Sequence, residues 1–470
     1  MLRKLLLLVI LCFPLLLHAQ RGKMTLSLKD AAALMQRNSP TLHIAEKSVG
    51  IARSERQKLN AFWYPVVNAS GMYVHLSDQV EVRQPLDTYT EPVKEFVQSV
   101  LPDNQLLSSI LDQVGSYTLT VPLFKRNLTT LDANILWPVF TGGKRIYATR
   151  IGNRMVDLAD EEKAEAYAVL QTELVQTYYA LRLAENVVAV REKTYQSLLQ
   201  HYNHALKLEA NGMITKAECL FAEVNSLEAK REWEAAKKEH EVAHSALCSL
   251  LDENNDVEYV PVSPLFVADG LPDSLYFQNL LPFGNYSVRK LRLEESIADN
   301  QLRISRSAYL PSITLIGKQT IYAHNLPRNL MPRTMIGVGF TWNLFDGLNR
   351  ESDVRMAQLS KQSLALGKVK AQNELSVLVQ KLYSEIQNAQ EEVKTLQTTI
   401  KMSEELLRIR RKSFDEGMVT SAEVVDAEVL LAKVRIAMLL AYYQFDVSLA
   451  ALCSVCGVPE MFWKYYQTSV

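Results

Sequence analysis

The sequence predicts a mostly α-helical fold with a transmembrane β part, made from two copies of one helix-and-strand unit. Three observations lead to this prediction. Two segments of roughly 68 residues run without a proline, more than 100 residues recur at a fixed spacing, and four segments alternate between apolar and polar side chains. A helix of roughly 68 residues would be about 100 Å long, several times the length of an ordinary globular helix.

The first long segment, residues 144–211, has the apolar spacing of a coiled-coil helix. Its larger apolar side chains recur at steps of three, four and seven residues. They are Leu170, Leu174, Tyr178, Leu181, Val188, Tyr195, Leu199, Tyr202 and Leu206. Gly212 follows directly, and a glycine just after a helix is a common C-terminal cap. We therefore expect one continuous helix with a seam for neighbouring helices.

The region around this helix occurs twice. Adding 205 to a residue number in the first copy gives its counterpart in the second, without an insertion over more than 100 residues. The matched pairs include Trp137 and Trp342, Gly212-Met213 and Gly417-Met418, Thr215 and Thr420, and Glu218 and Glu423. A period this long does not fit a solenoid repeat, so we interpret the chain as a duplicated half-protein.

The chain begins with the features of a signal peptide, residues 1–19. A positive start at Arg3 and Lys4 precedes an apolar run that ends at Leu17, and Ala19 supplies the small residue of a cleavage site. The pattern predicts export from the cytoplasm.

Each copy then has the same order of elements. The first copy, residues 20–251, comprises a helix that starts at Ser27 and breaks near Pro40, a β-hairpin at 64–140, a long helix at 144–211 and a helix at 215–251. A connection at 252–284 leads to the second copy, residues 285–456. This copy comprises a helix, a β-hairpin at 310–345, a long helix at 348–416 and a helix at 420–456. Residues 457–470 form a short tail. The offset between copies is 246 before the first hairpin and 205 after it, so the first hairpin loop is 41 residues longer. We expect residues 78–126 to be loop-like, with one short helix around 91–101.

The strand segments alternate between apolar and small or polar residues. In the second copy one face carries Ile313, Leu315, Ile336, Val338, Phe340 and Trp342. The opposite face carries Ser312, Thr314, Lys318, Gly339 and Thr341. About ten residues that are apolar on one side only is the pattern of a strand between lipid and a watery lumen. We therefore predict that the first set faces lipid.

Four strands per chain are too few for a closed barrel, which needs about eight. Open strand edges are not tolerated in lipid. The chain must therefore associate, and a homotrimer would supply twelve strands. The paired helices that continue from these strands would then form a ring, an α-barrel.

Charge and motif content argue against several kinds of function. The 51 Lys and Arg residues balance the 52 Asp and Glu residues, so no nucleic acid or other polyanion is indicated as a partner. No nucleotide-binding loop, nucleophile constellation or catalytic carboxylate pair is present, so we expect neither an enzyme nor a cofactor. Cys453 and Cys456 form a C-x-x-C, but inside an expected helix without a preceding strand, which favours small buried residues over a redox pair.

The chain resembles the TolC family of outer-membrane channel proteins. The residues that carry this resemblance are the helix-to-strand passages 61–65 and 307–311, the strand-to-helix passages 138–143 and 343–348, and the helix tips 212–215 and 417–420. Two positions depart from the family pattern: Asn343 stands where a proline is usual, and Leu348 where a second glycine is usual.

The resemblance implies a homotrimer in the outer membrane of a Gram-negative bacterium that extends into the periplasm. A twelve-stranded barrel would lie in the outer-membrane lipid above a long α-helical barrel. The expected function is a passive exit duct of a tripartite efflux pump or a type I secretion system. The expected partners are a periplasmic adaptor, or membrane fusion protein, and an inner-membrane transporter of the RND, ABC or MFS type.

The resemblance also assigns candidate site residues. Gly212, Met213, Gly417 and Met418 would form the helix tips that meet the adaptor. Glu423 and Asp426, three residues apart on one helix face, would form two rings of carboxylates at the channel constriction. The alternative for this pair is that Glu423 only completes a capping box with Thr420 and that Asp426 is solvated.

Parts of the sequence also fit two other functions. His240, Glu241 and His244 fit the H-E-x-x-H pattern of zinc peptidases, with Glu258 as a conceivable third ligand. The counterparts of the two histidines in the second copy are Phe445 and Leu449, which indicates coiled-coil positions instead. A periplasmic adaptor would also be exported and rich in coiled coil, but it would have one helical hairpin where this chain has two.

Overall fold

The computed structural model describes residues 22–102, 104–253, 257–326 and 332–469. The predicted signal peptide, residues 1–19, lies outside the described residues. The chain divides into two compact units, and each unit draws on both copies of the repeat. The first unit comprises the N-terminal segment to Ser54 with Asn153–Ile297 and Ser360–Val470, and the second comprises Glu55–Gly152 and Ala298–Leu359.

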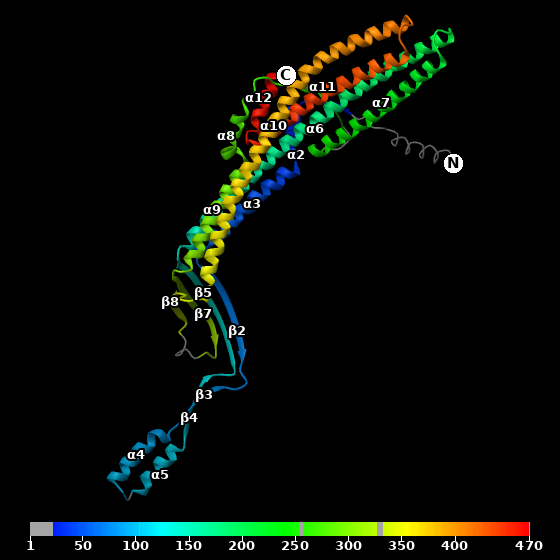
Figure 1. Ribbon diagram of the computed structural model, residues 1–470. Coiled ribbons are helices and arrows are strands. Elements are labelled where there is room, and N and C mark those ends of the chain that lie inside the picture. The colour runs from blue at the N-terminus through cyan, green and yellow to red at the C-terminus, as the bar shows by residue number, and fades with distance from the viewer. Residues whose placement is uncertain (1–21, 103, 254–256, 327–331, 470) are drawn as a thin grey trace, which may run out of the picture. The chain divides into compact units, whose positions relative to one another are not determined.

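The first unit is dominated by two long helical hairpins that run alongside one another (Figure 1). Helices α6 (Lys144–Ala210) and α10 (Asn349–Asp415) are each 67 residues long and start 205 positions apart. Their partners are α7 (Lys216–Leu251) and α11 (Ser421–Val455). All four helices begin and end within two residues of the segments expected from the sequence. None of the helices in the described ranges is both long enough and apolar enough to cross a membrane.

The shorter helices before each β-hairpin also follow local sequence signals. Ser27 caps α2 (Leu28–Asn38) by accepting the Asp30 N–H at 3.1 Å, and α3 (Pro40–Asn60) begins directly after the break at Ser39. In the second copy α9 (Tyr286–Ser307) takes the equivalent place.

The region expected to be a plain connection, residues 252–284, contains two elements. Strand β6 (Val257–Pro261) pairs in parallel with β1 (Gly22–Leu26), and α8 (Ser274–Gly284) follows. Residues 457–470 were expected to be a tail, but they contain α12 (Glu460–Ser469). Elements this short carry too few apolar repeats for a periodicity to be recognised.

These short elements complete the core of the first unit. The Tyr178 hydroxyl on α6 donates to the Leu26 carbonyl at 2.7 Å and accepts the Ser263 N–H at 3.0 Å. The Phe266 ring lies 5.9 Å from the Phe445 ring and 6.0 Å from the Phe462 ring. The inter-repeat segment is therefore packed between the long helices and α12.

The second unit contains a four-stranded antiparallel sheet with the order β2-β5-β7-β8. The strands are β2 (Val66–His75), β5 (Asn127–Thr141), β7 (Ser312–His324) and β8 (Thr334–Thr341), and the short helix η2 (Ala61–Trp63) precedes the first of them. Strands from both copies thus join one sheet. Within the described residues β2 and β8 are its edge strands, each paired on one side.

The long loop of the first hairpin is more regular than expected. It holds a two-stranded ribbon, β3 (Val80–Pro85) and β4 (Thr118–Phe124), that supports a helical hairpin of α4 (Asp87–Val100) and α5 (Gln105–Gly115). The expectation of a loop with one short helix at 91–101 was therefore wrong in its extent. The expected helix at 91–101 corresponds to α4, which begins four residues earlier, whereas α5 and the two strands were not expected.

Candidate functional site

The two helix tips have the same backbone geometry. Gly212 has φ of 71° and Gly417 has φ of 73°, the left-handed conformation that favours glycine. The Met213 N–H bonds to the Leu208 carbonyl at 2.9 Å, and the Met418 N–H bonds to the Ser413 carbonyl at 2.8 Å. These are the bonds of a Schellman cap, so sequence and structure agree on where both long helices end.

Both tips expose apolar surface to solvent. Met213 is 65% exposed and Met418 is 73% exposed. A Cβ added to Gly212 or Gly417 would meet no other atom within 4 Å. The predicted adaptor-contacting residues are therefore accessible in the protomer, and their contact with an adaptor stays a prediction.

The predicted constriction residues lie at the start of α11, just past the second tip. Glu423 completes a capping box with Thr420, and its carboxylate also forms an ion pair with Arg410 of α10. Asp426 is exposed. Glu423 therefore has the capping role considered as the alternative, and this role does not exclude a second role in a trimer.

Near the tips the two helical hairpins contact one another through polar side chains. His201 of α6 lies 2.7 Å from the Ser421 hydroxyl of α11, and Arg411 of α10 donates to the Ser197 hydroxyl of α6. Within the second hairpin, Arg411 also pairs with the buried carboxylate of Glu428 at 2.6 Å. Burial, with the neighbouring His204 and Arg411 charges, lowers the pKa of His201 to about 4. His201 is thus neutral at physiological pH. Sequence reasoning missed His201, Arg410 and Arg411, because their partners are distant in the chain or on another helix.

The sheet pairs its apolar residues across strands. Ile313 lies opposite Phe340 and Leu315 opposite Val338, while Ile336 lies opposite Gly317. Ile336 is 85% exposed and Phe340 64% exposed. Trp342 follows the end of β8 at Thr341 and is 51% exposed. The register therefore puts the paired residues on one face of the sheet, which is the face predicted to contact lipid.

The opposite face carries a polar network. The Asp132 carboxylate of β5 accepts the Thr320 hydroxyl at 2.6 Å and pairs with the Lys318 ammonium at 3.0 Å, both from β7. The Asn134 amide donates to the Ser70 hydroxyl of β2 at 3.0 Å. Asp132 is 7% exposed, so these bonds satisfy a buried charge on the face predicted to line a lumen.

The helix-to-strand junctions repeat the same contacts in both copies. The Trp137 indole donates to the Trp63 carbonyl and the Trp342 indole donates to the Tyr309 carbonyl, each at 3.1 Å. The Arg145 guanidinium lies 4.5 Å from the centre of the Trp63 ring, and the Arg350 guanidinium lies 4.8 Å from that of Tyr309. Each junction therefore places aromatic rings and a cation at the end of the strands, as expected at a membrane interface.

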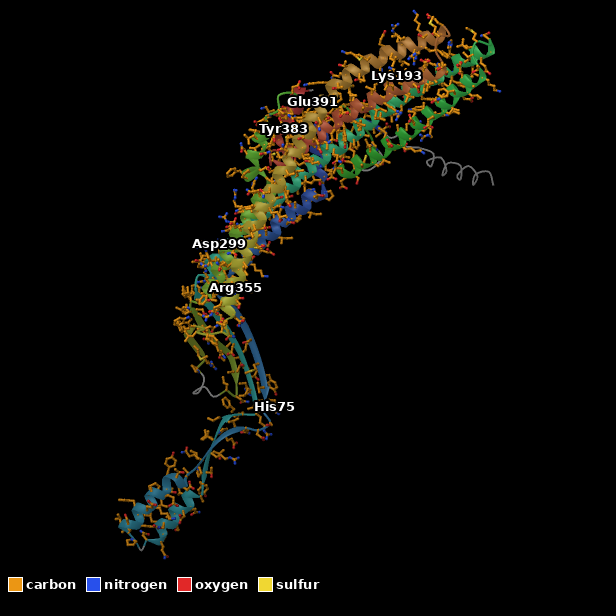
Figure 2. The ribbon with its side chains drawn as sticks, viewed as in Figure 1. His75, Lys193, Asp299, Arg355, Tyr383 and Glu391 are labelled. Carbon is orange, nitrogen blue, oxygen red and sulfur yellow. The ribbon has the colours of Figure 1, made fainter. Side chains whose placement is uncertain are left out.

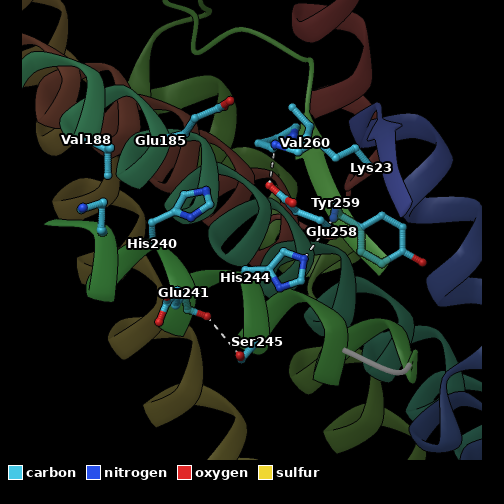
Figure 3. Close-up of a pocket in the computed structure, with 12 residues that line it drawn as sticks. Lys23, Glu185, Val188, His240, Glu241, His244, Ser245, Glu258, Tyr259 and Val260 are labelled. Atoms are coloured by element: carbon cyan, nitrogen blue, oxygen red, sulfur yellow. Dashed lines mark hydrogen bonds and ion pairs between the residues drawn. The ribbon is translucent and has the colours of Figure 1, made fainter. Parts of the chain in front are cut away.

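The H-E-x-x-H residues line a cavity of about 770 Å³ between α6, α7 and the β1–β6 pair (Figure 3). The His244 Nε2 atom accepts the Tyr259 N–H at 3.0 Å, and Glu258 pairs with Lys23 at 3.1 Å. In the part of the chain that the structure describes, no group of three or more His, Cys, Asp or Glu residues is placed to hold a metal ion. His244 therefore anchors β6 to α7.

Cys453 and Cys456 are buried and not bonded to one another. Burial raises the pKa of both thiols to about 12, so little thiolate forms at neutral pH. The Cys456 thiol faces the Phe277 carbonyl at 3.6 Å. Both cysteines are packing residues of the core.

Comparison with known proteins supports the whole-chain architecture. The chain matches the solved structure of CusC with a TM-score of 0.74 and 16% identity, covering 94% of this chain and 95% of that one. VceC from Vibrio cholerae matches with a TM-score of 0.73 and 16% identity, covering 92% of this chain and 96% of that one. The MtrE channel of Neisseria gonorrhoeae matches with a TM-score of 0.70 and 16% identity, covering 92% of this chain and 89% of that one. No curated protein sequence matches. The chain has the fold of these outer-membrane proteins, and the fold class predicted for the protomer is confirmed.

A protein-family model also matches part of the chain. The model described as outer membrane efflux protein matches residues 284–458, the second copy of the repeat. Residues 284–458 therefore match the outer membrane efflux protein family, and the resemblance to TolC-type channels found in the sequence is confirmed.

Proposed function

We propose that the protein is the outer-membrane channel of a tripartite efflux pump or type I secretion system. The observation that carries this proposal is a four-stranded sheet with one apolar and one polar face, joined to two 67-residue helices. The family match and the fold support an outer-membrane location. The protein would conduct substrates passively, since its fold is that of channel proteins.

The channel would be a homotrimer. The edge strands β2 and β8 expose unpaired backbone groups, and lipid does not tolerate such edges. Three sheets joined edge to edge would give twelve strands and a closed barrel. The polar network around Asp132 would then face the lumen, and Phe340 and Val338 would face lipid.

The periplasmic end would bind an adaptor. The exposed Met213 and Met418 at the two tips offer apolar anchors beside glycines, where another backbone can approach closely. An inner-membrane transporter would in turn engage the adaptor. Rings of Glu423 and Asp426 would narrow the channel above these tips and favour cations.

Reconstitution of the purified full-length protein into planar lipid bilayers tests the proposal. We expect stepwise ionic conductance from a trimer that is extracted from the outer-membrane fraction and dissociates on heating. Folded trimers from that fraction that conduct no ions would contradict the channel function. Recovery of the protein as a water-soluble species would contradict the location and favour an adaptor.

A further inference from the structure

The helical hairpin of the long loop, α4 and α5, leaves its large apolar side chains outside. Neither helix has a buried residue within the part of the chain that the structure describes. Phe96 is 68% exposed and Leu106 is 74% exposed, and the whole exposed set comprises Tyr89, Val93, Phe96, Val100, Leu106, Leu107, Ile110 and Val114. So much apolar surface on 25 helical residues, 14 in α4 and 11 in α5, marks a binding surface.

The contact between the two helices uses small and polar groups. A Cβ added to Gly115 would lie 2.6 Å from the Thr90 hydroxyl oxygen, so the helices approach closely at this point. Lys94 of α4 forms an ion pair with Asp112 of α5. The two helices thus contact one another through these small and polar groups, and their large apolar side chains remain exposed.

The exposed apolar residues have coiled-coil spacing. On α4, Tyr89, Val93, Phe96 and Val100 are separated by four, three and four residues. On α5, Leu107, Ile110 and Val114 are separated by three and four residues. Steps of three and four place each set along one stripe of its helix, the pattern by which helices pack lengthwise against other helices.

Charge argues against a lipid surface as the partner. Residues 87–115 contain five acidic residues, Asp87, Glu91, Glu95, Asp103 and Asp112, and one basic residue, Lys94. Amphipathic helices that lie on anionic membranes carry Lys and Arg on the polar face. The acidic composition of this segment would be repelled there. An all-helical bundle would leave the same acidic residues in water.

The β3–β4 ribbon that carries the hairpin is joined to the strands of the sheet by short segments. Strand β3 begins five residues after β2 ends at His75, and β5 begins three residues after β4 ends at Phe124. His75, labelled in Figure 2, bonds to Asn127 at 2.6 Å, which ties the end of β2 to the start of β5. Each protomer of a trimer would therefore bring one hairpin to the same end of the sheet.

We propose that the three α4–α5 hairpins of one trimer pack on one another through the residues Tyr89, Val93, Phe96 and Val100 and those of α5. The result is a six-helix bundle formed by three copies of this chain, and it rests on the proposed homotrimer. Helices of 11 and 14 residues are only marginally stable in isolation. Three hairpins tethered to one barrel have an effective concentration in the millimolar range, which favours the bundle.

Disulfide formation between protomers tests this proposal. Phe96→Cys would place three thiols around the bundle axis, within the roughly 7 Å between Cα atoms that a disulfide spans. Gln98→Cys is the matched control, because residue 98 is exposed and lies on the opposite side of α4. The chain's own cysteines in the described residues, Cys219, Cys248, Cys453 and Cys456, are buried and do not compete. We expect mild oxidation of proteoliposomes to link Phe96→Cys protomers about tenfold faster than Gln98→Cys protomers.

Light scattering of both variants in detergent checks the trimer independently. Trimers in which Phe96→Cys links no faster than Gln98→Cys would overturn the bundle and leave the channel function standing. Recovery of monomers would overturn both the bundle and the proposed trimeric channel. An environment-sensitive fluorophore on Phe96→Cys distinguishes the remaining occupants in vesicles of phosphatidylcholine and phosphatidylglycerol. Quenching by spin-labelled lipid would show docking on the membrane, and a water-exposed fluorophore would show a surface reserved for another protein; either result would overturn the bundle.

Discussion

The two copies of the repeat agree in their backbone and differ in the surroundings of their side chains. Both long helices end at a glycine with φ near 70°, and both junctions bond a tryptophan indole to the carbonyl that precedes the strand. Aligned positions beyond these contacts have diverged. Glu423 forms an ion pair with Arg410 through its carboxylate, whereas its counterpart Glu218 takes part in its cap through its backbone N–H, which donates to the Thr215 hydroxyl. The residues that form the turns and junctions are therefore the same in both copies, whereas residues that contact different neighbours differ.

The aligned pair Glu241 and Asp446 differs strongly in burial. Glu241 of α7 is exposed, whereas Asp446 of α11 is fully buried. One carboxyl oxygen of Asp446 accepts the Phe266 N–H at 3.4 Å, and the other has no hydrogen-bond partner among the described residues. The second copy therefore buries an acid where the first copy exposes one, because the inter-repeat segment packs against α11.

Arginine substitutions on the face predicted to contact lipid should have the largest effect in both copies. Phe340→Arg and its counterpart Ile135→Arg should each cost about 2–4 kcal/mol at mid-bilayer. We expect both variants to yield less heat-modifiable trimer in the outer-membrane fraction. Gly339→Arg is the control on the opposite face, where the nearest atom to a new Cβ is the flexible end of Ile316 at 3.3 Å. Greater loss for Gly339→Arg would reverse the face assignment.

The buried acid should make stability depend on pH. Burial raises the pKa of Asp446 well above its ordinary value, so between the unfolded and the folded pKa the folded protein binds a proton that the unfolded chain releases. The stability contributed by this proton is present below the unfolded pKa of about 4 and is lost as pH rises toward the folded pKa. Asp446→Asn removes this loss, and we expect it to stabilise the protein by about 1–3 kcal/mol at pH 8 and not at pH 4.

Thermal unfolding at several pH values measures this effect. The exposed counterpart supplies the control, since Glu241→Gln should change the unfolding temperature little at any pH. Equal destabilisation by Asp446→Asn at pH 4 and pH 8 would show that the carboxyl is not protonated in the folded state.

Much of this architecture could be predicted from the sequence, because it depends on long or local signals. The 67-residue helices are marked by many apolar repeats, and Gly212, Thr215 and their counterparts mark the turns. The strand β6 and helix α12 were missed because their stability comes from contacts distant in sequence, such as the parallel pairing of Glu258 with Lys23. The ion pair between Arg410 and Glu423 was missed for the same reason: it joins two helices across a turn.

The two helix tips should respond alike to substitution. A bulky residue such as leucine at Gly212 or Gly417 must adopt positive φ, which costs about 1–2 kcal/mol. Open space around both glycines means that this backbone strain is the main structural cost. We expect each variant to remain trimeric, and the double variant to lose chemical crosslinking to the adaptor. Undiminished crosslinking in folded double variants would exclude the tips as the contact. Loss from one single variant only would show that the adaptor binds the copies unequally.

The smallest expected effect concerns the acidic residues at the second tip. Removing one ring of carboxylates should cost about 0.5–1 kcal/mol of cation attraction, or about a two- to five-fold lower cation-to-anion permeability ratio. Asp426→Asn tests this without disturbing the capping box, whereas Glu423→Ala would also release Arg410. The first copy supplies the converse variant, Phe221→Asp, at the position aligned with Asp426. Single-channel recordings should show lower cation selectivity and weaker block by multivalent cations for Asp426→Asn, and higher selectivity for Phe221→Asp. If neither variant changes selectivity or block, Asp426 is a solvated surface residue and the constriction lies elsewhere.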